Sequence, residues 1–189
     1  DGEVWRVYAH VPSRNFDVLP DSLLNPAGTI FGDLLSRLRT FDGELETSIP
    51  GFHDIHSYLG QLDAVRALGE ADRELEYVDF RRERVVDSKD NTQIIHGDCK
   101  VNNLLFDPST DKAIKVVDLD TLMRGSASWD FGDLIRSISA GTEESTLEAH
   151  VSDARVGEVV RGFLAAYGPI TEVEEYAAAP AHMSFMLGT

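Results

Sequence analysis

The sequence is poor in several features that would each point to a class of protein. One cysteine among 189 residues allows no internal disulfide, so we expect a reducing, cytoplasmic location. No apolar run approaches the roughly 18 residues that cross a membrane, and no signal peptide is evident. Lys and Arg number 17 against 33 Asp and Glu, a formal net charge of −16. This balance argues against a nucleic-acid partner, and we interpret most carboxylates as a solvated surface.

The remaining composition is typical of a globular domain, with 42% hydrophobic residues. The sequence predicts a strand over 4–11, a loop over 123–127 and an irregular segment over 141–150. Helical spacing of apolar residues predicts helices over 25–41, 55–68, 72–86, 128–138 and 155–168, and one helix with the start of another over 170–189. Residues 94–118 are expected to form three short strands joined by a loop and a turn. This order predicts a mainly helical α+β domain.

The most informative stretch runs from Ile94 to Asp118. Two apolar residues lead into His96-Gly97-Asp98, and Asn103 follows five residues after Asp98. A second apolar run then ends at Asp118. Protein kinases carry H-R-D-x-x-x-x-N in their catalytic loop, followed by a metal-binding Asp. The spacing therefore predicts a phosphotransferase site.

Each residue type in this pattern suits one task of phosphoryl transfer. The carboxylate of Asp98 can accept the hydroxyl proton of an acceptor. Asn103 and Asp118 offer the hard oxygen ligands that Mg²⁺ prefers. Lys100, two residues after Asp98, can contact the transferred phosphate. We therefore predict Asp98 and Lys100 as catalytic residues, and Asn103 and Asp118 as the magnesium ligands.

Two neighbouring residues in the loop have structural interpretations. We interpret His96 as a brace that bonds backbone groups near Asp98. Cys99 is interpreted as a small packed residue rather than a nucleophile, because no general base for it is evident.

A literal Asp-Phe-Gly tripeptide begins at Asp130, but its context differs from that of a metal ligand. Asp118 directly follows an apolar strand, whereas Asp130 follows a loop and begins a helix. We therefore assign the metal to Asp118, and we expect Asp130 to accept backbone hydrogen bonds from the catalytic loop. Asp133 and Arg136 are spaced to pair on one helix. Asp120 is left open as a metal contact, a substrate contact or an exposed strand end.

These segments together resemble a known family. The chain is similar to the aminoglycoside phosphotransferase and choline kinase superfamily in His96-Gly97-Asp98 with Asn103, Val117-Asp118-Leu119-Asp120-Thr121, and Trp129-Asp130-Phe131-Gly132-Asp133-Leu134-Ile135-Arg136. Within it, residues 98–103, 118–121 and 49–54 are most similar to the N-acetylhexosamine 1-kinase branch. Cys99 departs from the Thr or Leu expected there.

The resemblance implies a two-lobed, protein-kinase-like fold that uses ATP and Mg²⁺. Residues 1–17 would be the last N-lobe strand and the hinge, with adenine near Ala9 and Val11. Residues 18–189 would form a C-lobe that is incomplete at its C-terminus. No Gly-rich phosphate loop and no strand Lys with a helix Glu partner are found. We therefore expect the N-lobe to be largely absent and this chain alone to be inactive.

The leading hypothesis is ATP-dependent phosphorylation of a small-molecule hydroxyl, with an N-acetylhexosamine-like sugar as the first acceptor. Aminoglycosides and choline-type amino alcohols are the alternative acceptors. A catalytically inactive binding module is a second hypothesis, which the complete set of Asp98, Asn103 and Asp118 argues against. A third takes His53 and Asp54, with His56 and His96, as a metal-dependent phosphohydrolase.

Overall fold

The computed structural model describes residues 5, 7–46, 48–66, 69, 72–82, 92–139 and 152–187. These described residues form six α-helices, four β-strands and two short 3-10 helices. The helices are α1 (Asp21–Leu38), α2 (Ile55–Val65), α3 (Asp72–Arg82), α4 (Ala127–Ser139), α5 (Asp153–Tyr167) and α6 (Val173–Leu187). The strands and 3-10 helices are β1 (Thr92–Ile95), η2 (Val101–Asn103), β2 (Leu104–Phe106), β3 (Ala113–Val116), η3 (Leu119–Thr121) and β4 (Met123–Ser126).

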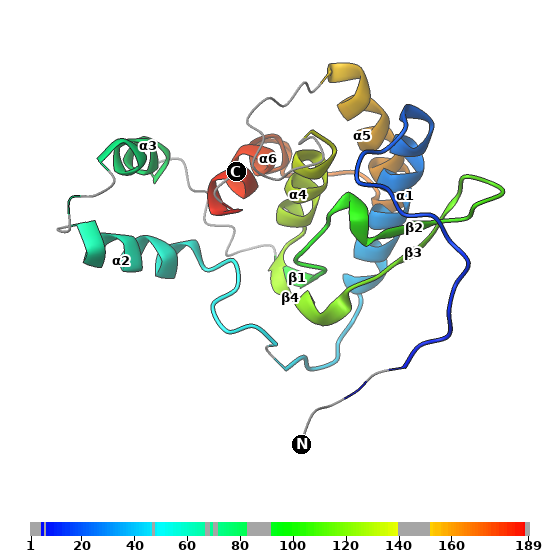
Figure 1. Ribbon diagram of the computed structural model, residues 1–189, viewed down its shortest axis with the longest axis horizontal. Helices are drawn as coiled ribbons and strands as arrows, with labels where there is room; N and C mark the ends of the chain where they lie inside the picture. The colour runs from blue at the N-terminus through cyan, green and yellow to red at the C-terminus, as the bar shows by residue number, and fades with distance from the viewer. Residues whose placement is uncertain are drawn as a thin grey trace.

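Two helix pairs form the body of the molecule. Helix α1 packs on α5, and α4 packs on α6 (Figure 1). The short strands lie against these helices, and α2 and α3 lie to one side. The side chains of Phe31 on α1 and Phe163 on α5 are both fully buried in the shared core. The expectation of a mainly helical α+β domain is confirmed.

Close contact between α1 and α5 depends on glycine. A Cβ atom at Gly28 would lie 2.1 Å from the Val159 carbonyl oxygen, and one at Gly162 would lie 2.1 Å from the Asn25 carbonyl oxygen. These distances are far below any real carbon–oxygen contact, so neither position has space for a side chain. The two backbones therefore approach each other through glycine on both sides.

Two antiparallel two-stranded sheets hold the central stretch. Strand β1 pairs with β4, with Ile95 opposite Met123, and β2 pairs with β3, with Leu104 opposite Val116. The loop of residues 96–103 connects the two sheets. This arrangement places the predicted loop between β1 and β2, and Asp118 just after β3.

Two expectations for strands were wrong in the described residues. Residues 5 and 7–11 have no regular secondary structure, and the rest of the expected strand over 4–11 lies outside the described residues. No described strand runs beside this segment, so its backbone has no ladder partner. The chain first pairs at Arg14, whose backbone bonds that of Phe106. The expected loop over 123–127 is instead β4 and the start of α4, because β1 supplies a partner for Met123–Ser126.

Two helix boundaries that were predicted from prolines were wrong. Helix α1 begins at Asp21 rather than at Asn25-Pro26, and Pro26 lies inside it. Helix α6 continues through Pro180 without the expected division. Burial of the helix face against neighbouring helices outweighs the lost backbone hydrogen bond in each case. The segment 141–150 and residues 83–86 lie outside the described residues.

Candidate active site

The loop after β1 turns sharply at Gly97. Its φ of 81° lies in the left-handed region that glycine adopts without steric cost. A Cβ atom there would also lie 2.6 Å from the Thr121 carbonyl oxygen. Glycine is therefore required both for the turn and for the close approach of η3, which follows Asp118.

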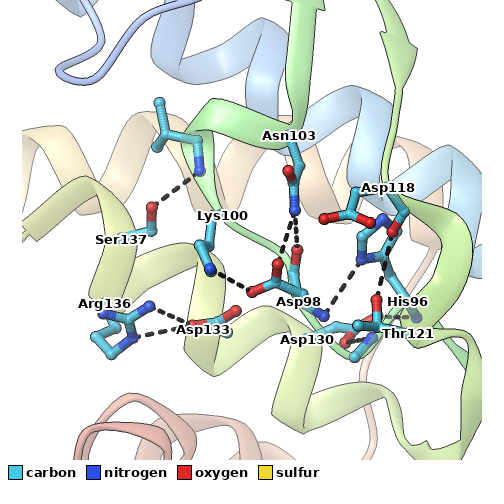
Figure 2. Close-up of polar contacts among 12 residues, drawn as sticks. His96, Asp98, Lys100, Asn103, Asp118, Thr121, Asp130, Asp133, Arg136 and Ser137 are labelled. Carbon is cyan, nitrogen blue, oxygen red and sulfur yellow. Dashed lines mark hydrogen bonds and ion pairs between the residues drawn. The ribbon is translucent and has the colours of Figure 1, made fainter. Parts of the chain in front are cut away.

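Asp130 braces this turn from below, as the sequence predicted. One of its carboxylate oxygens accepts a hydrogen bond from the His96 amide at 2.6 Å, and the other accepts from the Gly97 amide at 2.8 Å (Figure 2). Asp130 is buried, and this burial raises the pKa of its carboxyl while the backbone N–H groups oppose the rise. Both oxygens serve the loop, so the literal Asp-Phe-Gly tripeptide has a structural role.

His96 is a fully buried brace, and this prediction is also confirmed. Its Nδ1 accepts a hydrogen bond from the Asp98 amide at 3.2 Å. Its Nε2–H donates to the Val117 carbonyl at 2.9 Å. The ring therefore ties the backbone just before Asp118 to the backbone of Asp98.

The carboxylate of Asp98 has a defined partner on each oxygen. Asn103 Nδ2 donates to Asp98 Oδ2 at 3.0 Å and to the Asp98 carbonyl at 2.9 Å. The Lys100 ammonium lies 3.1 Å from Asp98 Oδ1. The Asp98 side chain is 16% exposed, so a proton donor can still reach it. Lys100, predicted to contact phosphate, pairs here with the predicted base.

Asp118 follows Val117, whose backbone bonds that of Asn103 just beyond the paired strands β2 and β3. The Val117 amide donates to the Asn103 carbonyl at 2.9 Å, and Figure 2 shows the Asp118 carboxylate on the same side as the Asn103 amide. Asp118 has a φ of 61° and is exposed. In the described part of the chain, no residue donates a hydrogen bond to its carboxylate.

The donor set of Asn103 and Asp118 fits Mg²⁺. The Asn103 amide nitrogen faces Asp98, which leaves its Oδ1 available as a neutral oxygen ligand. Asp118 adds an anionic oxygen. Within the described ranges, no three His, Cys, Asp or Glu residues cluster as an all-protein metal site. Two protein oxygens suit Mg²⁺, which usually takes further ligands from water and substrate phosphates.

Cys99 is buried beneath the loop, and its burial raises the pKa of the thiol well above the ordinary value. The nearby Asp130 carboxylate acts in the same direction. A thiol that resists ionisation is a poor nucleophile. The interpretation of Cys99 as a packed residue is confirmed.

Asp133 and Arg136 form the expected pair, but the pair is buried rather than solvated. Arg136 Nε donates to Asp133 Oδ1 at 2.9 Å, and the side chains are 2% and 6% exposed for Asp133 and Arg136. Burial raises the pKa of the Asp133 carboxyl, and Arg136 opposes this rise. The second carboxylate oxygen of Asp133, Oδ2, has no hydrogen-bond partner among the described residues.

The structure also shows two supports that the sequence did not reveal. Ser137 Oγ accepts a hydrogen bond from the Val101 amide at 2.9 Å. His53 Nε2–H donates to the Gly97 carbonyl at 2.6 Å. For the His53 contact, the neighbouring His53-Asp54 pair was the one feature of the sequence that drew attention to this position. For the Ser137 contact, a serine within a helix gives no such indication.

The phosphohydrolase hypothesis finds no support in the placement of its residues. The Asp54 carboxylate caps α2 by accepting from the Ser57 amide at 3.0 Å. Both ring nitrogens of His96 are hydrogen-bonded to the loop backbone. His53 is likewise engaged with Gly97. These groups are braces and caps rather than a shared set of metal ligands.

A cavity of about 590 Å³ lies beside η3. One wall is the connection between α1 and α2, including Ser48, Ile49 and Phe52. The other wall is the segment 120–124, which begins two residues after Asp118. Its volume is in the range of small-molecule sites. The structure leaves Ala9 and Val11 without regular secondary structure, and their predicted nucleotide contact stays a prediction.

The chain belongs to the phosphotransferase enzyme family. Residues 1–179 match the profile of that family, which covers nearly the whole sequence and every residue of the loop described above. This confirms the superfamily that the sequence resembles.

Among solved structures, the chain is similar to the crystal structure of an aminoglycoside-3'-phosphotransferase of type VIII. The TM-score is 0.57 at 18% sequence identity, and the match covers 93% of this chain. The chain spans 66% of that protein, slightly less than two thirds. Identity this low shows the fold alone, which is part of a kinase-like fold. None of the helices in the described ranges has the length and apolar character needed to cross a membrane.

Proposed function

We propose that this protein is an ATP- and Mg²⁺-dependent phosphotransferase that acts on the hydroxyl of a small molecule. The observation that carries the proposal is the pair of hydrogen bonds by which Asn103 Nδ2 holds Asp98, so that the amide oxygen of Asn103 is not used by Asp98; the Asp118 side chain lies beside Asn103 in Figure 2. A proton acceptor and a magnesium-binding pair are thereby fixed to each other. Family membership supports the same reaction class.

The proton acceptor in this proposal is Asp98. The acceptor hydroxyl attacks the terminal phosphorus of ATP, the bond from that phosphorus to the bridging oxygen breaks, and ADP leaves. Asp98 takes the hydroxyl proton as the new phosphorus–oxygen bond forms. Asn103 fixes the carboxylate that receives this proton.

Asn103 Oδ1 and the Asp118 carboxylate hold Mg²⁺ in the proposal. The bound ion supplies charge neutralisation on the phosphate oxygens. Lys100 lies on Asp98 before ATP binds, and its flexible, partly exposed ammonium moves to the transferred phosphate afterwards. Lys100 thus offsets one negative charge in each state.

The acceptor in this proposal binds in the cavity beside η3. Asp120 and Thr121 in the cavity wall are two and three residues after Asp118, and the walls offer both carboxylate and apolar groups. An N-acetylhexosamine-like sugar is the proposed acceptor, on the resemblance of residues 49–54, 98–103 and 118–121. An aminoglycoside is the second candidate, because the solved structure that shares this fold is named for that activity.

The first test is Asp98→Asn in the full-length protein. We expect phosphate transfer to fall by about a thousandfold or more, because the amide cannot accept the proton at neutral pH. Mg²⁺-dependent nucleotide binding, measured by calorimetry, should stay within about threefold of wild type. The wild-type protein is assayed against N-acetylhexosamines, other sugars, aminoglycosides and choline.

Asp111→Asn is the matched control, since Asp111 is an exposed aspartate that pairs with Arg14 outside this site. It should leave turnover unchanged. Retained turnover in Asp98→Asn would contradict the assignment of the base. Nucleotide binding without transfer to any acceptor in the wild type would favour the inactive binding module.

A further inference from the structure

The turn that precedes α2 contacts the catalytic loop through one buried side chain. His53 is 5% exposed, and its Nε2–H donates to the Gly97 carbonyl at 2.6 Å across 44 residues of sequence. Carbonyl oxygens only accept hydrogen bonds, so the proton must be on Nε2. This contact has no role yet in the proposed chemistry.

The accepted peptide group is the one that leads directly to Asp98. The carbonyl of Gly97 and the amide of Asp98 belong to the same planar unit, whose amide end donates to His96 Nδ1. His53 holds the opposite end of that unit. Because both ends of this peptide are held, the backbone to which the Asp98 side chain is attached is held as well, which favours one direction of the carboxylate toward Asn103.

The same turn forms a wall of the cavity beside η3. Ser48, Ile49, Gly51 and Phe52 line the cavity, and His53 follows them immediately. The Phe52 and His53 rings lie 3.9 Å apart between centroids. A displacement of this wall is therefore passed to the Gly97 carbonyl through adjacent residues.

The backbone of His53 makes the turn sensitive to the residue at this position. Its φ is 58°, in the left-handed region. Asn adopts this region more readily than most residues other than glycine, whereas Gln adopts it at a steric cost. The Asn amide, one methylene shorter, does not reach the position of His Nε2, whereas the Gln amide nitrogen does.

We propose that His53 is a positioning residue for phosphoryl transfer. It sets the direction of the Asp98 carboxylate through the Gly97 carbonyl, and it ties that direction to the cavity wall where the acceptor binds. This inference rests on the proposed function of Asp98. Asp133 Oδ2 and the two ring nitrogens of His182 have no hydrogen-bond partner among the described residues, but neither residue lines the cavity beside η3, and neither has a part in this inference.

The test compares His53→Asn with His53→Gln in the full-length protein. Both variants replace the ring by a neutral amide, so both lose the contacts with Phe52 and Trp129 equally. If His53 positions the base, His53→Asn lowers kcat by about tenfold. The buried Gly97 carbonyl then loses its hydrogen-bond donor, and the Asp98 carboxylate is no longer held in one direction. The KM for ATP should stay within about twofold, and His53→Gln should recover kcat to within about threefold of wild type.

A merely structural role in the turn predicts the reverse order, with His53→Asn near wild type and His53→Gln impaired. That order, or equal kcat values in both variants, would overturn the inference. Hydrogen exchange gives a readout that needs no turnover. The amides of residues 96–100 should exchange faster in His53→Asn and at the wild-type rate in His53→Gln.

The two proposals fail in different ways. If the wild type transfers phosphate and Asp98→Asn does not, but both His53 variants match the wild type, only the positioning role is wrong. If the wild type transfers no phosphate, the proposed function is wrong. Hydrogen exchange then still decides whether His53 holds the loop.

Discussion

Asp118 and Asp111 share a backbone conformation but differ in surroundings. Their φ values are 61° and 54°, both in the left-handed region that Asp and Asn tolerate. Asp111 pairs with Arg14, whereas Asp118 lies beside Asn103 at the proposed magnesium site. An Asp-to-Asn change therefore preserves the backbone conformation at both positions. It removes a negative charge from the proposed magnesium site only at position 118.

We expect Asp118→Asn to raise the Mg²⁺ concentration for half-maximal activity by about tenfold or more, since a neutral oxygen is a weaker ligand for Mg²⁺ than a carboxylate. Titration of activity with Mg²⁺ at saturating ATP measures this. Asp111→Asn should leave the midpoint in place. Equal Mg²⁺ midpoints in the wild type and Asp118→Asn would refute the ligand assignment.

At the residue scale, sequence reasoning succeeded for residues that belong to a motif with a known chemistry. The braces His96 and Asp130 were inferred from their places in the catalytic-loop and Asp-Phe-Gly motifs, although Asp130 bonds the loop across 34 residues. Ser137 and the role of His53 were missed, since no motif marks these contacts, which span 36 and 44 residues. Hydrophobic periodicity does not encode such pairings.

The β2–β3 connection is an element held by one carboxylate. Asp107 Oδ1 accepts hydrogen bonds from the Ser109 amide, the Ser109 hydroxyl and the Thr110 amide. These bonds, led by the Ser109 hydroxyl, lower the pKa of Asp107 to about 2. Because the folded state favours the ionised carboxyl, its stabilising effect is complete above about pH 4 and is lost as the pH falls toward 2.

Ser109→Ala should raise the pKa of Asp107 toward the ordinary value of about 3.9, because it removes the hydroxyl donor and keeps the amide donors. NMR titration of the Asp107 side-chain carboxyl measures the change. Ser13→Ala, a serine whose hydroxyl bonds the Val11 carbonyl instead, is the control. An unchanged titration in Ser109→Ala would show that the backbone amides alone hold the carboxylate.

At the element scale, local signals predicted most helices but not every boundary. Helices α2, α4 and α5 follow their apolar spacing. Strand β4 was read as a loop, because Gly125 and Ser126 favour turns and its partner β1 lies about thirty residues earlier. Proline at 26 and 180 was read as a boundary, since propensity reports the isolated helix and not its packed face.

The packing of α1 on α5 joins segments more than a hundred residues apart and closes the molecule. Its glycine contacts predict opposite effects for the same substitution at two positions of α5. Gly162→Ala should destabilise the protein by ~1–3 kcal/mol, because its Cβ would lie 2.1 Å from the Asn25 carbonyl oxygen. Gly157→Ala should stabilise it by up to ~1 kcal/mol, because Ala favours helix and the nearest atom, on Arg161, is 3.6 Å away.

Urea unfolding of the two variants and the wild type measures both changes. If Gly162→Ala matched Gly157→Ala, helix propensity would dominate and the two helices could separate at no cost. The opposite signs are expected because packed backbones have no flexible side chain that can move aside.

At the scale of the whole molecule, the kinase-like fold was predicted from motif resemblance rather than from hydrophobic pattern. Apolar periodicity gave a mainly helical α+β domain, which many unrelated proteins share. The loop from His96 to Asn103, with Asp118 after it, narrowed this class to one family, and the family match confirms it. The pairing of α1 with α5 and of α4 with α6 could not be deduced, because either helix pairing satisfies the same amphipathic faces.

The orientation of the Asn103 amide has a consequence for which residue can occupy that position. One end of its side chain presents hydrogen to Asp98, and in the proposed magnesium site the other end must present a lone pair to the metal ion beside Asp118. An aspartate of the same shape has lone pairs at both ends and would add a negative charge next to Asp98. A leucine of similar size has neither. Among side chains of this length, a terminal amide therefore provides both the donor and the acceptor. Replacement of Asn103 by either Asp or Leu should remove at least one of these two functions.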